Sequence, residues 1–273
     1  MSLPIDIILV RHGQSEGNAA KRLSEKGDHT AYTNINTGRH SRSYRLSKKG
    51  REQALQAGEW LQKEFYKDGK SFDRFIVSEY TRAMETASLL GLPDAEWYRN
   101  FYLTERDWGD IESSPENERA EKFKDALEMR IIEPFFWRPP NGESFADLCL
   151  RLDRVLHTLH RECSKKRVII VCHGEVMRAF RVLLERMSQQ RFKELYLSKS
   201  KEDGVFNCEI MHYTRRNPDT GIVEDHANWL RRIRPNEEPV WNTGWESIKR
   251  PRYSNEELLE IVEQTPSVLE QYE

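Results

Sequence analysis

The sequence predicts an α/β fold of three layers, with helices on both faces of a mostly parallel sheet, and two similar segments carry this prediction. An apolar run at 7–10 ends at an Arg-His-Gly tripeptide, 11–13. A second run at 168–171 ends at Cys-His-Gly, 172–174, and leads into a helical pattern. Branched aliphatic runs suit strands that are buried on both faces of a parallel sheet. Because such sheets bind ligands at the carboxyl edge of their strands, we expect both histidines at one ligand site.

The overall composition limits the number of cores and the classes of partner. The chain has 273 residues, of which 37% are hydrophobic and 32% are charged, so we expect one substantial domain with additions. A formal net charge of −2 gives no general attraction to nucleic acid or to an anionic membrane, and neither is predicted as a partner. No apolar run approaches a membrane span, the four cysteines lack CxxC spacing, and the N-terminus has no signal-peptide pattern. These features favour a cytoplasmic location.

After the first strand, the sequence predicts a long loop and then a capped helix. Residues 19–45 are polar and form a loop that is either simply solvated or a functional lid. As a lid, it would use Arg39, Arg42 or Arg45 to hold an anionic part of a substrate. Ser47 is a good N-cap for the helix that follows. The apolar face of this helix is expected from residues three or four apart, which are Ala54, Leu55, Gly58, Leu61 and Phe65.

The next elements are a strand at 72–78, a helix at 81–90 and a short strand at 96–98. Arg82 falls in the first turn of the helix, where the helix dipole disfavours a cation. A residue that conflicts with its local environment at the carboxyl edge of a strand indicates function. The alternative for Arg82 is a surface ion pair.

An insertion at about 100–143 is predicted to cap the sheet edge. Within it, 103–110 holds three carboxylates and an arginine, each of which could be merely solvated. A weakly helical stretch at 114–130 leads to an aromatic, proline-containing loop at 133–140. A cap of this kind would line the ligand site and set the choice of substrate. In the alternative, its aromatic residues anchor the loop in the core.

The second half of the domain is predicted to alternate between helix and strand. Ser144, with an aspartate three residues later, caps a helix that runs to about Cys163. Another helix is expected at 188–196 and a final strand at 206–213.

The α/β domain is expected to span 1–235, followed by an extension at 236–273. The basic run at 228–235 is read as a solvated strand edge, with a partner patch as the alternative. The turn-rich stretch that follows it is expected to lie across the domain as a strap. Ser254 begins a capping box and a short amphipathic helix, which we expect to dock on the domain or on a second copy, so a homodimer is one predicted assembly.

Several motifs together give the chain a resemblance to a known family. They are RHGQSEGN at 11–18, SEYTRAMETA at 78–87, GES at 142–144, HGEVMR at 173–178 and NC at 207–208. These motifs and their order resemble the histidine phosphatase superfamily, also called the phosphoglycerate mutase-like family. The resemblance extends from about residue 5 to residue 213, and it implies the same three-layer fold.

The resemblance also implies roles for the site residues. His12 would attack phosphorus and become transiently phosphorylated. Arg11, Arg82 and His173 would hold the phosphoryl oxygens and stabilise the developing charge. Glu105 would protonate the leaving group and then activate water, which requires a carboxyl group with a raised pKa. Within the carboxylate cluster, Asp107 is the second choice for this role.

Asn18 and Gly174 complete the predicted substrate-binding residues. The implied mechanism needs no metal and no cofactor. A metal site made of His12, His173 and a carboxylate is the competing interpretation, but the sequence contains no HxH or HExxH spacing around these residues.

Two sequence features favour hydrolysis over a mutase reaction. Mutases of the family carry Glu-Arg-His-Tyr-Gly, whereas this chain has Glu-Arg-Asp-Trp-Gly at 105–109, so Asp107 adds repulsion for a second anionic group. Mutases also carry a later Arg-Arg pair, and 110–140 contains no adjacent arginines. We therefore predict a phosphomonoesterase that acts on a small phosphorylated metabolite. Phosphoglycerate mutase-type transfer is the alternative, and a non-catalytic phospho-ligand or protein-binding module is an alternative of another class.

Overall fold

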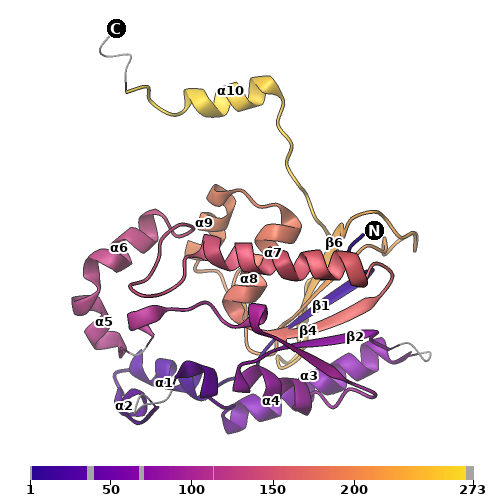
Figure 1. Ribbon diagram of the computed structural model, residues 1–273, viewed down its shortest axis with the longest axis horizontal. Coiled ribbons are helices and arrows are strands. Elements are labelled where there is room, and N and C mark those ends of the chain that lie inside the picture. Colours follow the sequence, from indigo (N-terminus) through magenta and orange to yellow (C-terminus); the bar gives the residue numbers. More distant parts are fainter. Residues whose placement is uncertain (1, 36–39, 68–70, 113, 269–273) are drawn as a thin grey trace.

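A computed structural model describes residues 2–35, 40–67, 71–112 and 114–268. The strands of these ranges form one eight-stranded sheet in the order β3-β2-β4-β1-β5-β6-β7, with β8 paired to β6. The strands are β1 Asp6–Arg11, β2 Arg74–Ser78, β3 Trp97–Asn100, β4 Arg167–Cys172, β5 Ile210–Thr214, β6 Trp229–Arg234, β7 Trp241–Asn242 and β8 Glu246–Ser247. Helices flank the sheet on both faces (Figure 1), which confirms the predicted α/β class.

The sheet has a parallel part and an antiparallel part. Strands β3, β2, β4 and β1 run parallel, whereas β5 pairs antiparallel with β1 and is followed by antiparallel β6, β7 and β8. The prediction of a final strand at 206–213 is wrong in where the strand begins and in making it the last one. Residues 206–209 form a turn, and β6 adds a further strand beyond β5.

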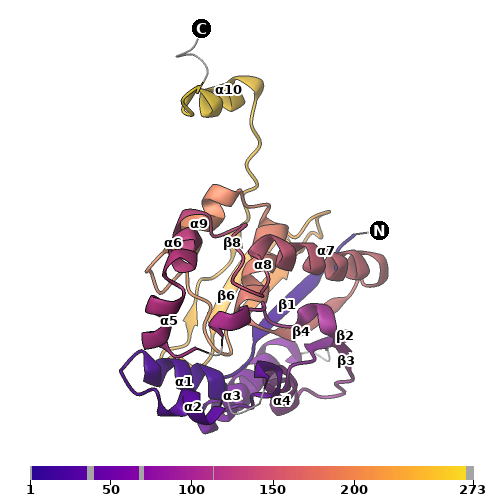
Figure 2. The same ribbon diagram turned by 60° about the vertical axis from the view of Figure 1, so that its left-hand side comes forward.

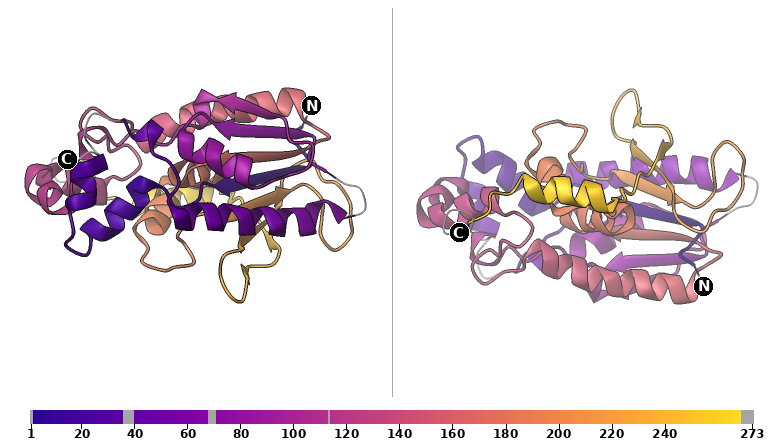
Figure 3. Two further views of the ribbon diagram at one scale, coloured as in Figure 1. Left: turned by 90° about the horizontal axis from the view of Figure 1, so that it is seen from below. Right: turned by 90° about the horizontal axis from the view of Figure 1, so that it is seen from above.

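Two hydrophobic cores lie on opposite faces of the sheet. Ile8 and Val10 pack with helices α3 (Lys48–Phe65) and α4 (Thr81–Leu89). Ile7 and Leu9 pack with α7 (Phe145–Glu162) and α8 (Gly174–Glu185). This alternation follows from the two-residue period of a strand, and Figure 3 shows the sheet between α3 and α7.

The predicted N-caps of two helices are confirmed. Ser47 accepts a hydrogen bond from the Gly50 N–H at the start of α3, and Ser144 forms a capping box with Asp147 at the start of α7. One detail of the α3 prediction is wrong, because Leu55 is 51% exposed. Its interval from Ala54 is a single residue, and adjacent helical residues point about 100° apart.

The predicted loop at 19–45 is largely helical, which corrects the sequence analysis. The segment holds most of α1 (Glu16–Ser24), then α2 (Thr30–Ile35) and the short 3-10 helix η1 (Ser41–Ser43). Helix α1 is nucleated by a reciprocal cap between Ser15 and Asn18, which lies outside the usual Glu or Gln pattern. Few α1 residues are buried, so its amphipathic signal was weak.

The structure describes two of the three arginines that a lid at 19–45 was predicted to use. Arg45 pairs with Glu85 at 3.1 Å, Arg42 is exposed, and Arg39 lies outside the described residues. None of the described arginines of 19–45 lines the cavity reported below.

The cap insertion consists of short helices at one end of the domain. They are η3 Phe101–Leu103, η4 Gly109–Ile111, α5 Glu116–Lys122 and α6 Lys124–Ile132, and α9 Gln189–Leu197 lies close to them. Figure 2 shows α5 and α6 stacked above α1 and α2. The aromatic loop follows the anchoring alternative, because Trp137 is buried with Ile111 and Phe123. Phe136 is exposed, and none of the residues 133–140 lines the cavity reported below.

The C-terminal extension differs from the prediction. Helix α10 (Asn255–Glu263) has the expected Ser254 cap, but it stands away from the domain on an extended linker (Figure 1). Its apolar residues Leu258 and Val262 are exposed, so docking on its own domain is wrong. Docking on a second copy stays a prediction. Among the described residues, no helix has the length and apolarity needed to cross a membrane.

Candidate active site

Two histidines meet at the carboxyl edge of the parallel strands. His12 follows β1 and His173 follows β4, and the register pairs Arg11 with Cys172 directly before them. The two imidazole centroids are 5.1 Å apart, and both side chains are buried. The repeated strand-His-Gly pattern thus delivers two imidazoles to one place.

The hydrogen bonds of His12 leave the lone pair of its imidazole on Nε2. Nδ1 lies 2.7 Å from the Gly13 carbonyl oxygen, which assigns the proton to Nδ1. The lone pair on Nε2 accepts a hydrogen bond from Arg82 Nε at 3.2 Å. Burial, followed by the charges of Arg82 and Arg11, lowers the pKa of His12 well below 6.5. The imidazole is therefore neutral at neutral pH.

The turn after His12 has room only for glycine. A Cβ atom on Gly13 would lie 2.3 Å from the Gly50 carbonyl oxygen of α3. The Gly13 N–H donates to Thr86 Oγ1 of α4 at 3.1 Å. Close backbone approach is a use of glycine that no other residue can match. The turn is thereby tied to both helices of this face.

Two arginines flank His12, of which Arg82 is buried and Arg11 is partly buried. Arg11 Nη1 donates to the Val205 carbonyl oxygen at 2.6 Å, and its Nε has no partner among the described residues. Arg82 Nη1 donates to the Ser41 carbonyl oxygen at 2.9 Å. A guanidinium stays charged even where burial lowers its pKa, as burial does for both residues. The surface ion pair considered for Arg82 is excluded, because its side chain is buried.

His173 presents an unused N–H group. Ser78 Oγ accepts from the Tyr80 N–H at 3.3 Å, so its own proton is free to go to His173 Nε2, 2.7 Å away. The proton of the imidazole is then on Nδ1, which is buried and has no partner among the described residues. Burial, then the charges of Arg82 and His12, lowers the pKa of His173 well below 6.5. We therefore assign His173 as a neutral donor.

A carboxyl group completes the cluster. The ligand atoms of His12, Glu105 and His173 lie within 4.8 Å of one another. Burial, then the nearby Glu175 carboxylate, raises the pKa of Glu105. The second choice, Asp107, is exposed and accepts from the Gly109 N–H at 2.8 Å, which is a turn-forming role.

The same three residues have a spacing that could hold a metal ion. Their surroundings oppose one, because the guanidinium groups of the partly buried Arg11 and the buried Arg82 adjoin the cluster. Like charges repel strongly where water is excluded, so the local field favours an anion over a cation. The lone pair of His12 that would bind a metal also accepts from Arg82.

The remaining two predicted residues line the same site. Asn18 Oδ1 accepts from the Ser15 N–H and from Asn207 Nδ2, which leaves its amide nitrogen as the donor for a ligand. Gly174 begins α8, and a Cβ there would lie 3.3 Å from Arg11 Nε. The absence of a side chain lets Arg11 lie against the N-terminus of α8, whose dipole also favours an anion.

Comparisons with known proteins agree with this geometry. Residues 7–202 match the family described as the histidine phosphatase superfamily (branch 1). The chain belongs to this superfamily. It is 31% identical over 198 residues to a 2,3-bisphosphoglycerate-dependent phosphoglycerate mutase of Methylorubrum extorquens, covering 70% of this chain and 84% of the mutase.

Other superfamily proteins are also similar. The 6-phosphofructo-2-kinase/fructose-2,6-bisphosphatase of Gallus gallus is 30% identical over 175 residues, which cover 64% of this chain and 32% of that protein. In structure, the chain is similar to a putative alpha-ribazole-5'-P phosphatase from Escherichia coli K-12. The TM-score is 0.59 at 20% identity, over 82% of this chain and 96% of that one. This likeness shows a shared fold.

Beyond the superfamily motifs, a polar cavity of about 420 Å³ opens between the phosphate site and the cap. The cap contributes two cationic residues to the cavity, Arg119 and Arg130. They are not adjacent in sequence, so they do not form the Arg-Arg pair that mutases of the family carry. Arg119 is occupied by the Ser114 carbonyl oxygen and the Tyr32 hydroxyl. Arg130 lies over the Trp108 ring at 4.9 Å. The acidic lining residues are Glu25, Glu105, Glu112, Glu116 and Glu175.

Sequence reasoning missed the groups that orient the site. Ser78 bonds to the His173 ring, and Asn207 donates to the His12 carbonyl oxygen. Both are polar residues of the motifs given above, so the sequence contained a signal that could have identified them. Val205 and Ser41 hold the two arginines through backbone carbonyl oxygens. A backbone group leaves no trace in residue type, so these two could not be found.

Proposed function

We propose that this chain is a phosphomonoesterase that hydrolyses a small phosphorylated metabolite through a phosphohistidine at His12. One observation carries the proposal: a neutral imidazole whose Nε2 lone pair accepts from the buried Arg82, with the charge of Arg11 nearby and a protonatable carboxyl within 4.8 Å. Nucleophile, charge stabiliser and general acid are thus adjacent.

In the first half-reaction, the substrate phosphate replaces His12 as the partner of Arg82 Nε. His12 Nε2 then attacks phosphorus in line, so that a P–N bond forms while the P–O bond to the leaving group breaks. Arg11 and the Nδ1–H of His173 hold the equatorial oxygens with Arg82. Glu105 gives its proton to the departing oxygen.

The second half-reaction reverses the role of Glu105. The carboxylate removes a proton from water, and the resulting oxygen nucleophile attacks phosphorus as the P–N bond to His12 breaks. Inorganic phosphate leaves, and Glu105 holds the proton for the next cycle. The neutral imidazole is a good leaving group because the pKa of His12 is lowered by its surroundings.

Hydrolysis is favoured over mutase chemistry by two carboxylates of the cavity lining, which as a whole is mixed in charge, with five glutamates and six arginines or lysines. A mutase has to retain a bisphosphate, and Glu112 and Glu116 oppose its second anionic group. The similarity to named mutases and the presence of Arg130 support the mutase as the second candidate. Adding 3-phosphoglycerate with a trace of the 2,3-bisphosphate separates the two. Rapid formation of 2-phosphoglycerate would reverse the preference.

Release of phosphate from p-nitrophenyl phosphate tests the proposal. We expect turnover that persists in excess chelator and is lost in His12→Ala. The matched control is His157→Ala, because His157 is an exposed histidine of α7. Turnover in His12→Ala at the wild-type rate would refute the nucleophile, and loss of wild-type turnover in chelator would favour a metal site. A wild-type chain that binds phosphate without turnover would favour the binding module.

The proposed place of action is the cytoplasm. The four cysteines are buried free thiols, which suits a reducing compartment.

A further inference from the structure

A turn at 205–209 holds two residues of the phosphate site, Arg11 at the end of β1 and His12 directly after it. Arg11 Nη1 donates to the Val205 carbonyl oxygen at 2.6 Å. Asn207 Nδ2 donates to the His12 carbonyl oxygen at 3.1 Å. Any shift of this turn therefore shifts the guanidinium of Arg11 and the backbone of His12 together.

The turn is closed by the side chain of Glu209. Glu209 Oε2 accepts from the Phe206 N–H at 2.9 Å, and the Glu209 N–H donates to the Phe206 carbonyl oxygen at 3.0 Å. Between them, Cys208 adopts a φ of +56°, in the left-handed region that non-glycine residues avoid. Such a conformation persists only where its surroundings determine it.

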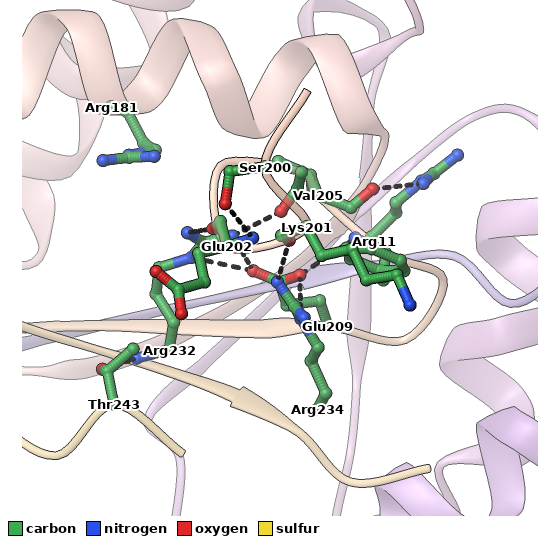
Figure 4. A network of polar contacts seen from close by, with 12 residues as sticks. Arg11, Arg181, Ser200, Lys201, Glu202, Val205, Glu209, Arg232, Arg234 and Thr243 are labelled. Atoms are coloured by element: carbon green, nitrogen blue, oxygen red, sulfur yellow. Dashed lines mark hydrogen bonds and ion pairs between the residues drawn. The ribbon is translucent and has the colours of Figure 1, made fainter. Parts of the chain in front are cut away.

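Those surroundings are two arginines of β6, as Figure 4 shows. The fully buried carboxylate of Glu209 lies 2.5 Å from Arg232 Nη2 and 3.1 Å from Arg234 Nε. Arg232 also donates to the Gly204 carbonyl oxygen at 2.5 Å, and Arg234 to that of Lys201 at 2.7 Å. One carboxylate and two guanidinium groups thus fix both ends of the segment that leads into the turn. A buried carboxylate requires partners of this kind.

The support continues into the C-terminal extension. The guanidinium of Arg234 lies 3.8 Å from the centroid of the Trp241 ring on β7. Both strands lie outside residues 7–202, which match the superfamily. The prediction that the basic run on β6 is a solvated edge is therefore wrong, because its Arg232 and Arg234 are buried and bind Glu209 of the 205–209 turn. Arg232 and Arg234 are 5% exposed.

We propose that Glu209, Arg232 and Arg234 are positioning residues, which set the direction of the Arg11 guanidinium through the 205–209 turn. The inference rests on the proposed phosphatase function. Arg11 has to meet a phosphoryl oxygen in one geometry, and stabilisation of this kind depends on donors that are already in place. The network supplies that placement from a strand that contributes no residue to the cavity lining.

The test compares Arg234→Gln with Arg231→Gln. Arg231 is on the same strand and pairs with Glu64 at 2.7 Å, so its variant breaks a partly buried ion pair without touching Glu209. We expect Arg234→Gln to lower kcat/KM for p-nitrophenyl phosphate by about 10- to 100-fold, since small misplacements of catalytic groups have effects of this size. Orthovanadate inhibition weakens alongside it, and Arg231→Gln stays within about 2-fold of wild type, because it leaves the Glu209 network intact.

Trp241→Leu is the second variant, because it removes the ring beneath Arg234 and keeps every charge. Thermal melts establish that each variant is folded under the assay conditions. A folded Arg234→Gln or Trp241→Leu protein with wild-type kcat/KM and vanadate affinity would overturn the inference. So would an equal loss in Arg231→Gln, because the effect would then be general to the strand.

A double-mutant cycle tests the route through Arg11. If the network acts through that guanidinium, adding Arg234→Gln to Arg11→Gln costs much less than it does in wild type. If the double variant loses kcat/KM by the product of the two single-variant losses, the inference is contradicted. Failure of the proposed function is distinguishable, because it would show as a wild-type chain that binds orthovanadate or phosphate and does not hydrolyse the ester.

Discussion

The two arginines beside His12 are held in different ways. Arg11 donates to a carbonyl oxygen of a turn that Glu209 closes, and that carboxylate is fully buried between two further arginines. Arg82 donates to the carbonyl oxygen of Ser41, in a 3-10 helix of three residues with exposed neighbours. One guanidinium has a buried ionic support, and the other has a single backbone contact, to a buried serine in a short 3-10 helix.

This difference suggests a division of work. Arg82 Nε bonds to the nucleophilic nitrogen of His12, so it has to change partner when phosphate binds. Arg11 has no such bond to break, and its Nε is unpartnered among the described residues. We infer that Arg11 fixes where the phosphoryl group sits, and that Arg82 keeps the imidazole in place until a substrate takes over its donor.

Removing either cation is expected to have the largest effect. Arg11→Gln and Arg82→Gln should each lower kcat by about 10²- to 10³-fold, as loss of a transition-state donor does. They should differ in pH dependence. Arg82 lowers the pKa of His12 more than Arg11 does, so Arg82→Gln moves the acidic limb of kcat/KM further toward higher pH. Equal shifts in the two pH profiles would break the comparison, and lysine variants that keep the charge serve as controls.

Glu105→Gln should slow alkyl phosphates by about 100-fold or more and aryl phosphates much less, since good leaving groups need no proton. The reaction needs His12 neutral and Glu105 protonated. The raised pKa of Glu105 keeps its proton to higher pH, and activity is lost as pH rises through that pKa. The glutamine variant should lack this alkaline limb. Asp107→Asn is the matched control, and equal losses on both ester types would contradict the acid role.

Ser78→Ala tests whether His173 acts as a neutral donor. Without the hydroxyl, Nε2 of His173 loses its partner and the Nδ1–H form is no longer selected. A buried group left unpaired costs about 1–3 kcal/mol, so kcat should fall by about 10-fold. A folded Ser78→Ala variant with wild-type kcat would show that a group other than Ser78 selects the Nδ1–H tautomer of His173.

Ser41→Ala should have the smallest effect. The Ser41 hydroxyl bonds to the partly buried Glu112 carboxyl, while its carbonyl oxygen, which holds Arg82, remains. Loss of one hydrogen bond of about 1 kcal/mol predicts a change in kcat/KM of about 5-fold or less. A loss larger than that of Arg234→Gln would reverse the ranking of the two supports.

Much of the parallel half of the molecule could be predicted from sequence. Residues 7–10 and 168–171 are continuous apolar runs, and such runs have few alternatives to a buried strand. The histidines that end them, together with Arg82, stood out because they are polar residues at the carboxyl edge of strands. Local patterns therefore located most of the candidate site.

The antiparallel half was harder, because its stability comes from pairs that are distant in sequence. Arg232 and Arg234 read as a solvated run, and only their pairing with Glu209 on the neighbouring strand makes their burial possible. The short helix α1 was missed since its cap uses Asn18 and its burial is slight. Helix α10 was predicted correctly as a helix, but no local pattern tells which surface, if any, its apolar face meets.

The most direct test of the central claim is to trap the phosphoenzyme. A phosphomonoester labelled in its phosphate is mixed with enzyme, quenched in alkaline denaturant within one turnover, and the peptides are analysed by mass spectrometry. We expect an acid-labile phosphate on the peptide that carries His12, absent in His12→Ala and present in His157→Ala. Label on another residue, or steady turnover without a phosphorylated His12 at any time point, would contradict it.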